Sequence, residues 1–309
     1  MCDYLVTGGC GFIGSHLVAA LVGADERVRV LDDLSTGRLS NLDGCREQVD
    51  VIEGDVRCRE TVERAVQGIS YVFHEAALVS VFDSVERPHV NHEVNVTGTL
   101  NLLTAAAGAG VKRLVFASSS AVYGNAPDLP KHEGMLPAPA SPYAVAKLTG
   151  EHMLRVHAEL YGLQTVSLRY FNVFGPRQDA SSPYSGVISK FCRALRQDEA
   201  PTVFGDGGQT RDFVFVDDVV QANLLAMQSA AVGRGECFNI GTGGQTSLLH
   251  LLETLQQLTG RAPEPVFRAA REGDVRHSCA DIARAGEVLV YTPRHTLQQG
   301  LVELLAHPG

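Results

Sequence analysis

The sequence predicts an α/β fold in which a doubly wound parallel sheet is followed by a smaller C-terminal α/β domain. Short apolar runs alternate with longer amphipathic segments through the first half of the 309 residues, a pattern typical of parallel strands joined by right-handed helical crossovers. After about residue 170 the alternation loosens and Gly and Pro become frequent, as in a loop-rich second domain. We therefore expect one domain at residues 1–170 and another at 171–309, with roughly residues 213–238 returning to the first.

The expected elements of the first domain follow from the spacing of its apolar residues. Strands are expected at residues 4–6, 27–31, 49–52, 71–74, 114–117 and 165–169, because each run is short, apolar and bounded by polar or turn-forming residues. Helices are expected at residues 12–22, 59–66, 94–108 and 143–161, where apolar residues recur every three or four positions. A sheet of this kind binds ligands beyond the carboxyl ends of its strands. Candidate functional residues are therefore sought directly after these runs.

The charge balance argues against two classes of partner. Lys and Arg total 26 against 35 Asp and Glu, which gives a formal net charge of −9, and no segment is rich in Lys or Arg. A nucleic acid or an anionic membrane surface is therefore not expected as a partner. No apolar stretch reaches the length of about 18 residues that a membrane-spanning helix needs.

The cysteines and histidines indicate neither disulfides nor a metal site. The seven cysteines are scattered and form no C-x-x-C pair, so we expect reduced thiols and a cytoplasmic location. A strand-like run begins almost at Met1, which leaves no room for a signal peptide. His89, His92 and Glu93 lie close together but match no metal-binding motif, and we expect a solvated helix end there and no metal.

A glycine-rich loop, TGGCGFIG, follows the first strand. Gly8, Gly11 and Gly14 permit a tight turn, close approach of the backbone to a pyrophosphate, and packing of the next helix on the strand. That helix offers free N–H groups and the positive end of its dipole to phosphates. A purely structural turn is the alternative. The strand before the loop and the amphipathic helix after it favour a dinucleotide site.

Three acidic residues at strand ends bear on which dinucleotide is bound. Asp32 ends the second strand, where a carboxylate can accept both ribose hydroxyls and repels a 2′-phosphate, so NAD is favoured over NADP. Asp33 is either a further cofactor contact or the cap of a turn. Asp55 follows the third strand, where it either holds the adenine amino group or caps a loop.

A serine run and a Tyr-x-x-x-Lys pair supply candidate catalytic groups. Ser119 lies where the fifth strand ends, at the ligand-binding edge of the sheet. Tyr143 and Lys147 are four residues apart at the start of a helix, so they share one face and the ammonium can lower the pKa of the phenol. A tyrosine tuned in this way is a general base for a sugar hydroxyl, with Ser119 bonded to the same oxygen. Tyr123 has no lysine at this spacing and is expected to pack or to line the pocket.

With these motifs, the sequence resembles the extended short-chain dehydrogenase/reductase family, and within it the NAD-dependent nucleotide-sugar epimerases and dehydratases. The likeness covers essentially the whole chain. It implies a Rossmann-type domain with tightly bound NAD, a nucleotide-sugar domain, and a homodimer formed through a four-helix bundle, here with the helices at 94–108 and 143–161. The further cofactor contacts that it implies, besides Tyr143 and Lys147, are Phe12, Ile13, Val56, Ala76 and Asn95.

The residues that follow Ser119 narrow the reaction. Dehydratases and uronate decarboxylases of this family carry acids just after the catalytic Ser or Thr, in patterns like S-T-D-E-V-Y-G. Ser120 and Ala121 occupy those positions here, and neither can protonate a leaving hydroxyl at neutral pH. The resemblance therefore implies an NAD-dependent 4-epimerase of a UDP-sugar that works through a transient 4-keto intermediate.

Segments of the second half resemble the family's UDP-sugar site. The R-Y-F-N turn resembles one whose Asn contacts the sugar phosphates, and V-F-G resembles the uracil and ribose segment. Two arginine segments, R-D-F and R-E-G-D, resemble anion-binding ones, and guanidinium groups suit diphosphate oxygens. A surface ion pair is the alternative for each arginine. The substrate-binding residues implied, besides Ser119 and Tyr143, are Asn172, Val203, Phe204, Arg211, Arg271 and Asp274.

Ser278 bears on the choice of sugar. In galactose epimerases of the family that are confined to plain hexoses, a bulky tyrosine stands four residues after the aspartate that corresponds to Asp274, and a small residue there leaves room for an N-acetyl group. Ser278 holds that position, so the resemblance implies interconversion of UDP-GlcNAc and UDP-GalNAc, and also of UDP-Glc and UDP-Gal. A UDP-glucose or UDP-glucuronate 4-epimerase and a non-catalytic NAD-binding sensor are the alternatives.

Overall fold

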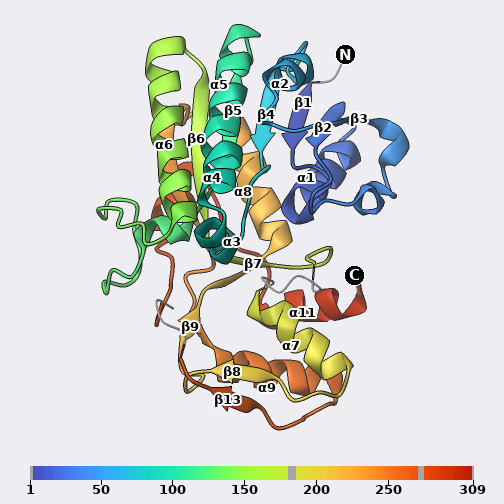
Figure 1. Ribbon diagram of the computed structural model, residues 1–309, viewed down its shortest axis with the longest axis vertical. Coiled ribbons are helices and arrows are strands. Elements are labelled where there is room, and N and C mark those ends of the chain that lie inside the picture. Colours follow the sequence, from blue (N-terminus) through green and yellow to red (C-terminus); the bar gives the residue numbers. More distant parts are fainter. Residues whose placement is uncertain (1–2, 180–185, 271–274, 308–309) are drawn as a thin grey trace.

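A parallel sheet forms the centre of the molecule in the computed structural model, which describes residues 3–179, 186–270 and 275–307 (Figure 1). Its seven strands follow the order β11-β6-β5-β4-β1-β2-β3, and each neighbouring pair is parallel. The order reverses between β1 and β4, which is the point where sheets of this class bind ligands. The predicted doubly wound α/β fold is confirmed.

Strands β1 to β6 begin and end within two residues of the positions predicted for them. The sheet strands are β1 (Tyr4–Thr7), β2 (Val28–Asp32), β3 (Val49–Glu53), β4 (Tyr71–His74), β5 (Arg113–Ser119), β6 (Gln164–Tyr170) and β11 (Arg234–Ile240). The helices beside them are α1 (Phe12–Gly23), α2 (Arg59–Ala65), α3 (Val81–Glu86), α4 (Pro88–His92), α5 (Gly98–Gly108), α6 (Pro142–Tyr161) and α8 (Val216–Gln228). Short 3-10 turns occur at Leu39–Leu42, Arg46–Gln48 and Ser120–Tyr123.

The helix predicted at residues 94–108 is wrong in its first turn. A π-helical turn, Glu93–Thr97, leads from α4 into α5. The wider turn accompanies an inward-facing amide at Asn95, which bonds to the backbone of Leu78 and to the side chain of Asn91. The apolar spacing does not reveal such a turn, because one additional residue leaves most of the helix pattern unchanged.

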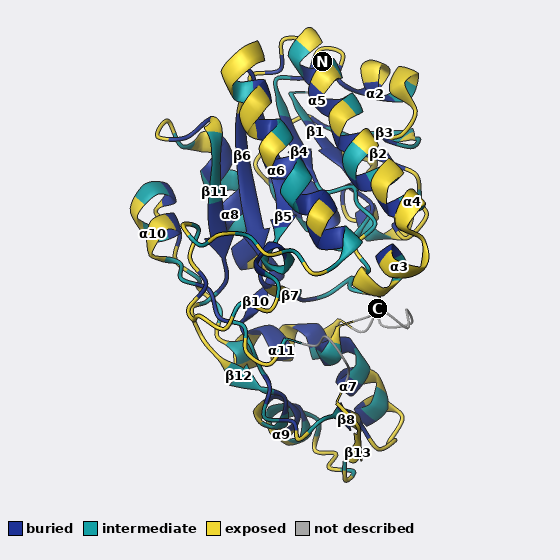
Figure 2. Ribbon diagram, turned by 60° about the vertical axis from the view of Figure 1, so that its left-hand side comes forward, coloured by how far each residue is buried: buried dark blue, intermediate teal, exposed yellow. Residues whose placement is uncertain are grey.

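Two layers of helices cover the two faces of the sheet. Along β1, Leu5 belongs to the core under α2, α5 and α6, and Val6 belongs to the core under α1 and α8, as the alternation of side chains along a strand requires. Figure 2 shows the strands buried between helices whose outer faces are exposed. Apolar side chains thus cover most of both faces of the sheet.

A smaller lobe lies below the carboxyl edge of the sheet in Figure 1. Its core contains Phe191, Leu195, Leu251, Leu255 and Leu304. The elements of the second half, apart from α8 and β11, are β7 (Asn172–Phe174), α7 (Val187–Arg196), β8 (Thr202–Phe204), β9 (Thr210–Arg211), β10 (Phe213–Phe215), β12 (Thr246–Ser247), α9 (Leu248–Thr259), β13 (Val266–Arg268), α10 (Ala283–Leu289) and α11 (Leu297–Ala306). None of the helices within the described ranges is long and apolar enough to cross a membrane.

Candidate active site

The glycine loop between β1 and α1 forms a cradle that side chains cannot occupy. Gly8 has a φ of +70°, and a Cβ at this position would lie 2.7 Å from the backbone nitrogen of Ala76. A Cβ at Gly14 would lie 2.1 Å from the carbonyl oxygen of Gly8. Gly11 caps α1 without any side-chain hydrogen bond, so the N–H groups of the first turn, which includes Phe12 and Ile13, have no side-chain acceptor. The loop therefore fits the pyrophosphate of a dinucleotide.

Asp32, at the end of β2, is hydrogen-bonded to the backbone of this loop. Its two carboxylate oxygens accept hydrogen bonds from the backbone of Cys10 and of Leu34, each at 2.9 Å. The side chain is only 6% exposed, and burial raises its pKa. Each oxygen keeps a second lone pair, so the carboxylate can still accept a ribose hydroxyl. The predicted contact with NAD is compatible with this geometry and stays a prediction.

Asp33 and Asp55 both cap local turns. The Asp33 carboxylate accepts from the backbone and the hydroxyl of Ser35, at 3.0 and 2.6 Å. The Asp55 carboxylate accepts from the backbone and the guanidinium of Arg57, and the Arg57 side chain lowers its pKa. The capping alternative is thus seen at both positions. Their contacts with NAD remain predictions.

The other predicted cofactor residues line the same edge from β4 to α5. Ala76 follows β4 and donates its N–H to the hydroxyl of Thr7 at 3.3 Å. Val56 is buried in the core beneath α5. The Asn95 amide both donates to and accepts from the backbone of Leu78 at 2.9 Å, so it holds the segment that follows Ala76. A direct contact of these residues with NAD is untested.

Ser119, Tyr143 and Lys147 converge where β5 ends and α6 begins. Ser141 caps α6 with its hydroxyl and Pro142 starts the helix, which directs Tyr143 and Lys147 from its first two turns toward the sheet. The Ser119 side chain lies close enough to the Tyr143 phenol to lower its pKa. The Lys147 ammonium donates to the carbonyl of Ala117 at 2.8 Å and lies 5.8 Å from the centre of the Tyr143 ring. The structure thus brings together the three residues that the sequence singled out.

Burial dominates the electrostatics of this group. It raises the pKa of Tyr143 to about 12, against the lowering effect of the nearby Ser119 side chain. Burial also lowers the pKa of Lys147 to about 8. The sequence led us to expect that Lys147 lowers the pKa of Tyr143. That expectation is wrong, because burial of the Tyr143 phenol dominates its pKa and the Lys147 ammonium bonds to the carbonyl of Ala117 instead.

The predicted substrate residues of the second half that the structure describes are linked to one segment, residues 209–212. Phe204 accepts from the Gln209 amide at 2.7 Å through its carbonyl, and its neighbour Val203 is buried. Asn172 donates its N–H to the carbonyl of Asp212 at 3.0 Å, and Ser278 donates its N–H to the carbonyl of Thr210 at 3.1 Å.

Arg211 therefore lies between the segments that carry Asn172 and Ser278. This segment is also tied to the candidate catalytic groups, because Ser119 pairs with Tyr170 across β5 and β6, and Asn172 follows two residues later. Arg271 and Asp274 lie outside the described residues, and their predicted roles stay predictions.

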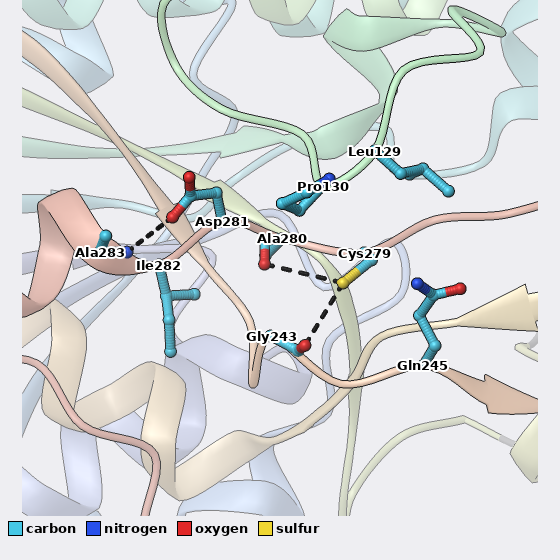
Figure 3. A pocket seen from close by; sticks show the side chains of 9 residues that line it. All are labelled: Leu129, Pro130, Gly243, Gln245, Cys279, Ala280, Asp281, Ile282 and Ala283. Carbon is cyan, nitrogen blue, oxygen red and sulfur yellow. Dashed lines mark hydrogen bonds between the residues drawn. The ribbon is translucent and has the colours of Figure 1, made fainter.

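One cavity of about 570 Å³ borders the segment after Ser278 (Figure 3). Its walls come from residues 129–130, Gly243, Gln245 and residues 279–283. The Cys279 thiol in its wall donates to the carbonyls of Gly243 and Ala280. Neither Ser119 nor Tyr143 lines this cavity, so we do not assign the sugar to it.

Sequence reasoning missed Glu75, a charged group that acts on both Tyr143 and Lys147. Glu75 follows β4 directly and accepts from the Tyr170 hydroxyl at 2.9 Å. A charged residue at the end of an apolar strand, on the ligand edge, is the signal that could have revealed it.

Tyr123 is buried, donates to Asn239 and accepts from Arg169. It therefore packs in the interior, which is one of the two outcomes expected from the sequence. Within the described residues, no group of three or more His, Cys, Asp or Glu side chains could hold a metal ion.

Comparisons with known proteins agree with this geometry. Residues 4–241 match the model of the NAD dependent epimerase/dehydratase family. The UDP-glucose 4-epimerase of Mycolicibacterium smegmatis is 40% identical over 308 residues, which cover 97% of this chain and 96% of that protein. The solved UDP-N-acetylglucosamine 4-epimerase of Methanobrevibacter ruminantium M1, in complex with UDP-N-acetylmuramic acid, superposes with a TM-score of 0.94 at 38% identity and covers 99% of this chain and 98% of its own.

The solved UDP-glucose 4-epimerase of Thermotoga maritima with UDP-glucose is equally similar, with a TM-score of 0.94 at 40% identity and the same coverage of 99% and 98%. These proteins differ in the sugar that their names give, while their similarity to the chain is nearly the same. The similarity therefore identifies the family but does not identify the sugar of the substrate.

Proposed function

The chain belongs to the NAD dependent epimerase/dehydratase family, its cofactor is NAD, and on that premise we propose that it is a UDP-sugar 4-epimerase. The proposed substrates are UDP-GlcNAc and UDP-GalNAc, and also UDP-Glc and UDP-Gal. The observation that carries the proposal is the convergence of Tyr143, Lys147 and Ser119 at the carboxyl end of β5, on the sheet edge that also carries the glycine cradle. Bound NAD supplies the hydride acceptor for C4 of the sugar.

The chain's own residues supply binding, orientation and proton transfer. Tyr143 takes the proton from the 4-hydroxyl, and Ser119 donates to the same oxygen. Lys147, charged at neutral pH because its pKa is about 8, favours the phenolate through its positive charge once substrate and cofactor are bound. The transient 4-keto sugar must then turn, so that reduction on its other face gives the C4 epimer and Tyr143 returns its proton.

Ser120 and Ala121 support epimerisation over dehydration or decarboxylation. Both lie in the 3-10 turn Ser120–Tyr123, directly after Ser119. Neither is an acid that could protonate a leaving hydroxyl. We therefore propose that a 4-keto sugar formed beside this turn is mainly reduced back to a hydroxyl.

Ser278 supports acceptance of acetamido sugars. Its backbone is held beside Arg211 through the bond to Thr210, and Arg211 is proposed to bind the diphosphate together with Asn172. A serine at this position leaves volume that a large side chain would fill. Glucuronate epimerisation or a restriction to plain hexoses is the rival within the same class, and a non-catalytic NAD sensor is the rival outside it.

The proposal extends to domain organisation, assembly and location. Residues 1–170 bind NAD and residues 171–309 bind the nucleotide sugar, with about 213–238 returning to the first domain. Exposed apolar side chains on α5 and α6, including Leu100, Val145, Val156 and Leu160, are 43–68% exposed, and we propose that they form a four-helix bundle with a second copy. The described cysteines are free thiols, as in proteins of the reducing cytoplasm, and we propose that location.

The test is a comparison of kcat/KM on UDP-Glc, UDP-GlcNAc and UDP-glucuronate, with inversion at C4 followed by proton NMR. We expect product from the first two sugars. Turnover of UDP-glucuronate alone would replace this proposal by the uronate alternative. Bound NAD with no turnover of any of the three would support a sensor.

A further inference from the structure

Glu75 is a carboxyl group at the ligand edge of the sheet for which the proposed chemistry has no role. Its backbone N–H donates to the carbonyl of Thr7 at 3.1 Å, which ties it to the strand end from which the glycine loop starts. The preceding His74 turns to the other face of the sheet, where its ring bonds to the hydroxyls of Thr7 and Thr99. Glu75 therefore faces the side on which α8 lies.

Three elements fix the Glu75 carboxyl in place. Its Oε1 accepts from the hydroxyl of Tyr170, at the end of β6, at 2.9 Å. The Tyr170 oxygen in turn accepts from the amide of Asn223, on α8, at 2.7 Å, and the same amide donates to the carbonyl of Val219 at 2.9 Å. Tyr170 and Asn223 are 7% and 0% exposed. A buried hydrogen-bond chain thus orients one carboxyl group at the active edge.

The charge of Glu75 acts on both members of the catalytic pair. His74 pairs with Phe116 across β4 and β5, so Glu75 lies beside Ala117, whose carbonyl accepts from the Lys147 ammonium at 2.8 Å. Ionised Glu75 raises the pKa of Tyr143 and that of Lys147. Burial raises the pKa of Glu75 itself to about 7, against the lowering effects of Tyr170 and Lys147. Glu75 thus changes its charge in the range where the enzyme is expected to work.

The other titratable groups around Glu75 keep one charge state near neutral pH or are members of the pair itself. From α6, Tyr143 and Lys147 face it, with pKa values of about 12 and about 8. From β6, Tyr170 faces it, and burial raises the Tyr170 pKa well above its ordinary value. On its own strand, burial lowers the pKa of His74 to about 3, so the imidazole is neutral. The residues that approach from α8 and β1, Asn223 and Thr7, do not titrate.

We propose that Glu75 is a positioning residue whose carboxylate keeps Lys147 protonated beside Tyr143, so that the reaction extends to higher pH before Lys147 loses its proton. The inference rests on the proposed function, because it takes Tyr143 as the base and Lys147 as the cation that supports it. Ionised Glu75 and protonated Lys147 attract each other, and each favours the charged form of the other. The same carboxylate also disfavours the phenolate of Tyr143. It therefore raises the pKa of Tyr143 as well as that of Lys147.

Glu75→Gln tests this assignment through the shape of the pH–rate profile. The amide has the size of the carboxyl and can accept from Tyr170, but it carries no charge at any pH. Lys147 then loses its proton more easily, so the alkaline limb of kcat should move to lower pH by about one unit. The acid limb below pH 7 should move less, since wild-type Glu75 is already largely protonated there. A uniform drop in kcat with both limbs in place would mean a structural role and would overturn the proposal.

Two further variants make the result specific. Glu303→Gln removes a carboxylate from an exposed position on α11 and should leave the profile unchanged. Tyr170→Phe keeps the Glu75 carboxyl but removes the bond that lowers its pKa, so Glu75 ionises at higher pH. Its alkaline limb should move in the same direction as that of Glu75→Gln, by a smaller amount. If Glu75→Gln does not fold, an unshifted limb in Tyr170→Phe would overturn the proposal.

A titration without turnover separates this inference from the proposed function. In the NAD-loaded, substrate-free protein, ionisation of Tyr143 is followed by ultraviolet difference absorbance, with the Tyr143→Phe form of each protein subtracted. Tyr143 should ionise at lower pH in Glu75→Gln than in the wild type. Equal titrations would overturn the inference even if every UDP-hexose is epimerised. A shifted titration would support it even if the wild type epimerises none of them.

Discussion

At the scale of single residues, the site consists of groups whose neighbours alter their chemistry. Tyr143 and Lys147 could be found by spacing, because residues four apart share a helical face. The raised pKa of Tyr143 could not be found in this way, because it comes from burial by the surrounding elements. Glu75 was missed for a similar reason, since its partners Tyr170 and Asn223 are distant in the sequence and meet it only in the folded protein.

Ser278 provides a prediction about specificity. Under the proposed function, Ser278→Tyr fills the volume that an N-acetyl group needs. We expect kcat/KM for UDP-GlcNAc to fall by about 100-fold, while the value for UDP-Glc changes only a few-fold, about the discrimination that pocket volume can supply. Initial rates with the two sugars measure it, and Ser278→Ala is the matched control that adds no volume. An equal loss for both sugars would refute the assignment of Ser278 to the sugar pocket.

At the scale of elements, helix α6 carries the catalytic pair and a buried ion pair on one face. Glu151 follows Lys147 by four residues, and its carboxylate accepts from the Arg169 guanidinium at 2.8 and 2.7 Å and from the Ser118 hydroxyl at 2.5 Å. Both side chains of the pair are at most 5% exposed. The pair therefore fixes α6 against β5 and β6, next to the residues that perform the chemistry.

Glu151→Gln should destabilise the protein by about 3–5 kcal/mol, because it leaves the Arg169 charge buried without a counter-charge. Urea unfolding followed by circular dichroism gives the free energy of unfolding. The surface variant Glu303→Gln should change it by less than about 0.5 kcal/mol. If Glu151→Gln is as stable as the wild type, the ion pair does not hold α6 in place.

The same scale shows what patterns can and cannot predict. The ends of the first six sheet strands followed from short apolar runs, since both faces of each strand are covered by helices. The π-helical turn Glu93–Thr97 and the buried Arg113, which donates to four backbone carbonyls at the end of α8 and beyond it, left no periodic signal. Such features depend on bonds between distant segments. They belong to tertiary structure and not to local pattern.

At the scale of the whole molecule, the proposed dimer explains the apolar outer faces of α5 and α6. Figures 1 and 2 show these two helices side by side, with exposed residues along their outer surface. Leu160 and Tyr161 near the end of α6 are 68% and 63% exposed. A second copy would remove this apolar surface from water.

Light scattering should therefore give a mass close to twice 33.1 kDa for the wild type. Leu160→Glu should shift the mass toward 33.1 kDa at the same concentration, because a carboxylate would be buried in the bundle. Val302→Glu, on α11 of the smaller lobe, adds the same charge at a position that is 49% exposed and should leave the mass unchanged. A wild-type mass of one chain at all concentrations would contradict the proposed assembly.

The fold of the molecule as a whole was predictable because alternating strands and helices leave few possible topologies. The UDP-sugar site was less so, since Asn172, Arg211 and Ser278 meet only through backbone bonds between separate segments. Their grouping around residues 209–212 came from the resemblance to a family and from the structure, not from spacing.

The proposed function depends above all on Tyr143 as the base of a C4 epimerisation. The most direct test measures the rate of C4 inversion of UDP-GlcNAc by NMR, for the wild type and for Tyr143→Phe, in proteins with equal NAD content and equal thermal stability. We expect epimerisation by the wild type and a loss of about 100- to 10,000-fold in kcat for the variant. Near-normal inversion by Tyr143→Phe would contradict it.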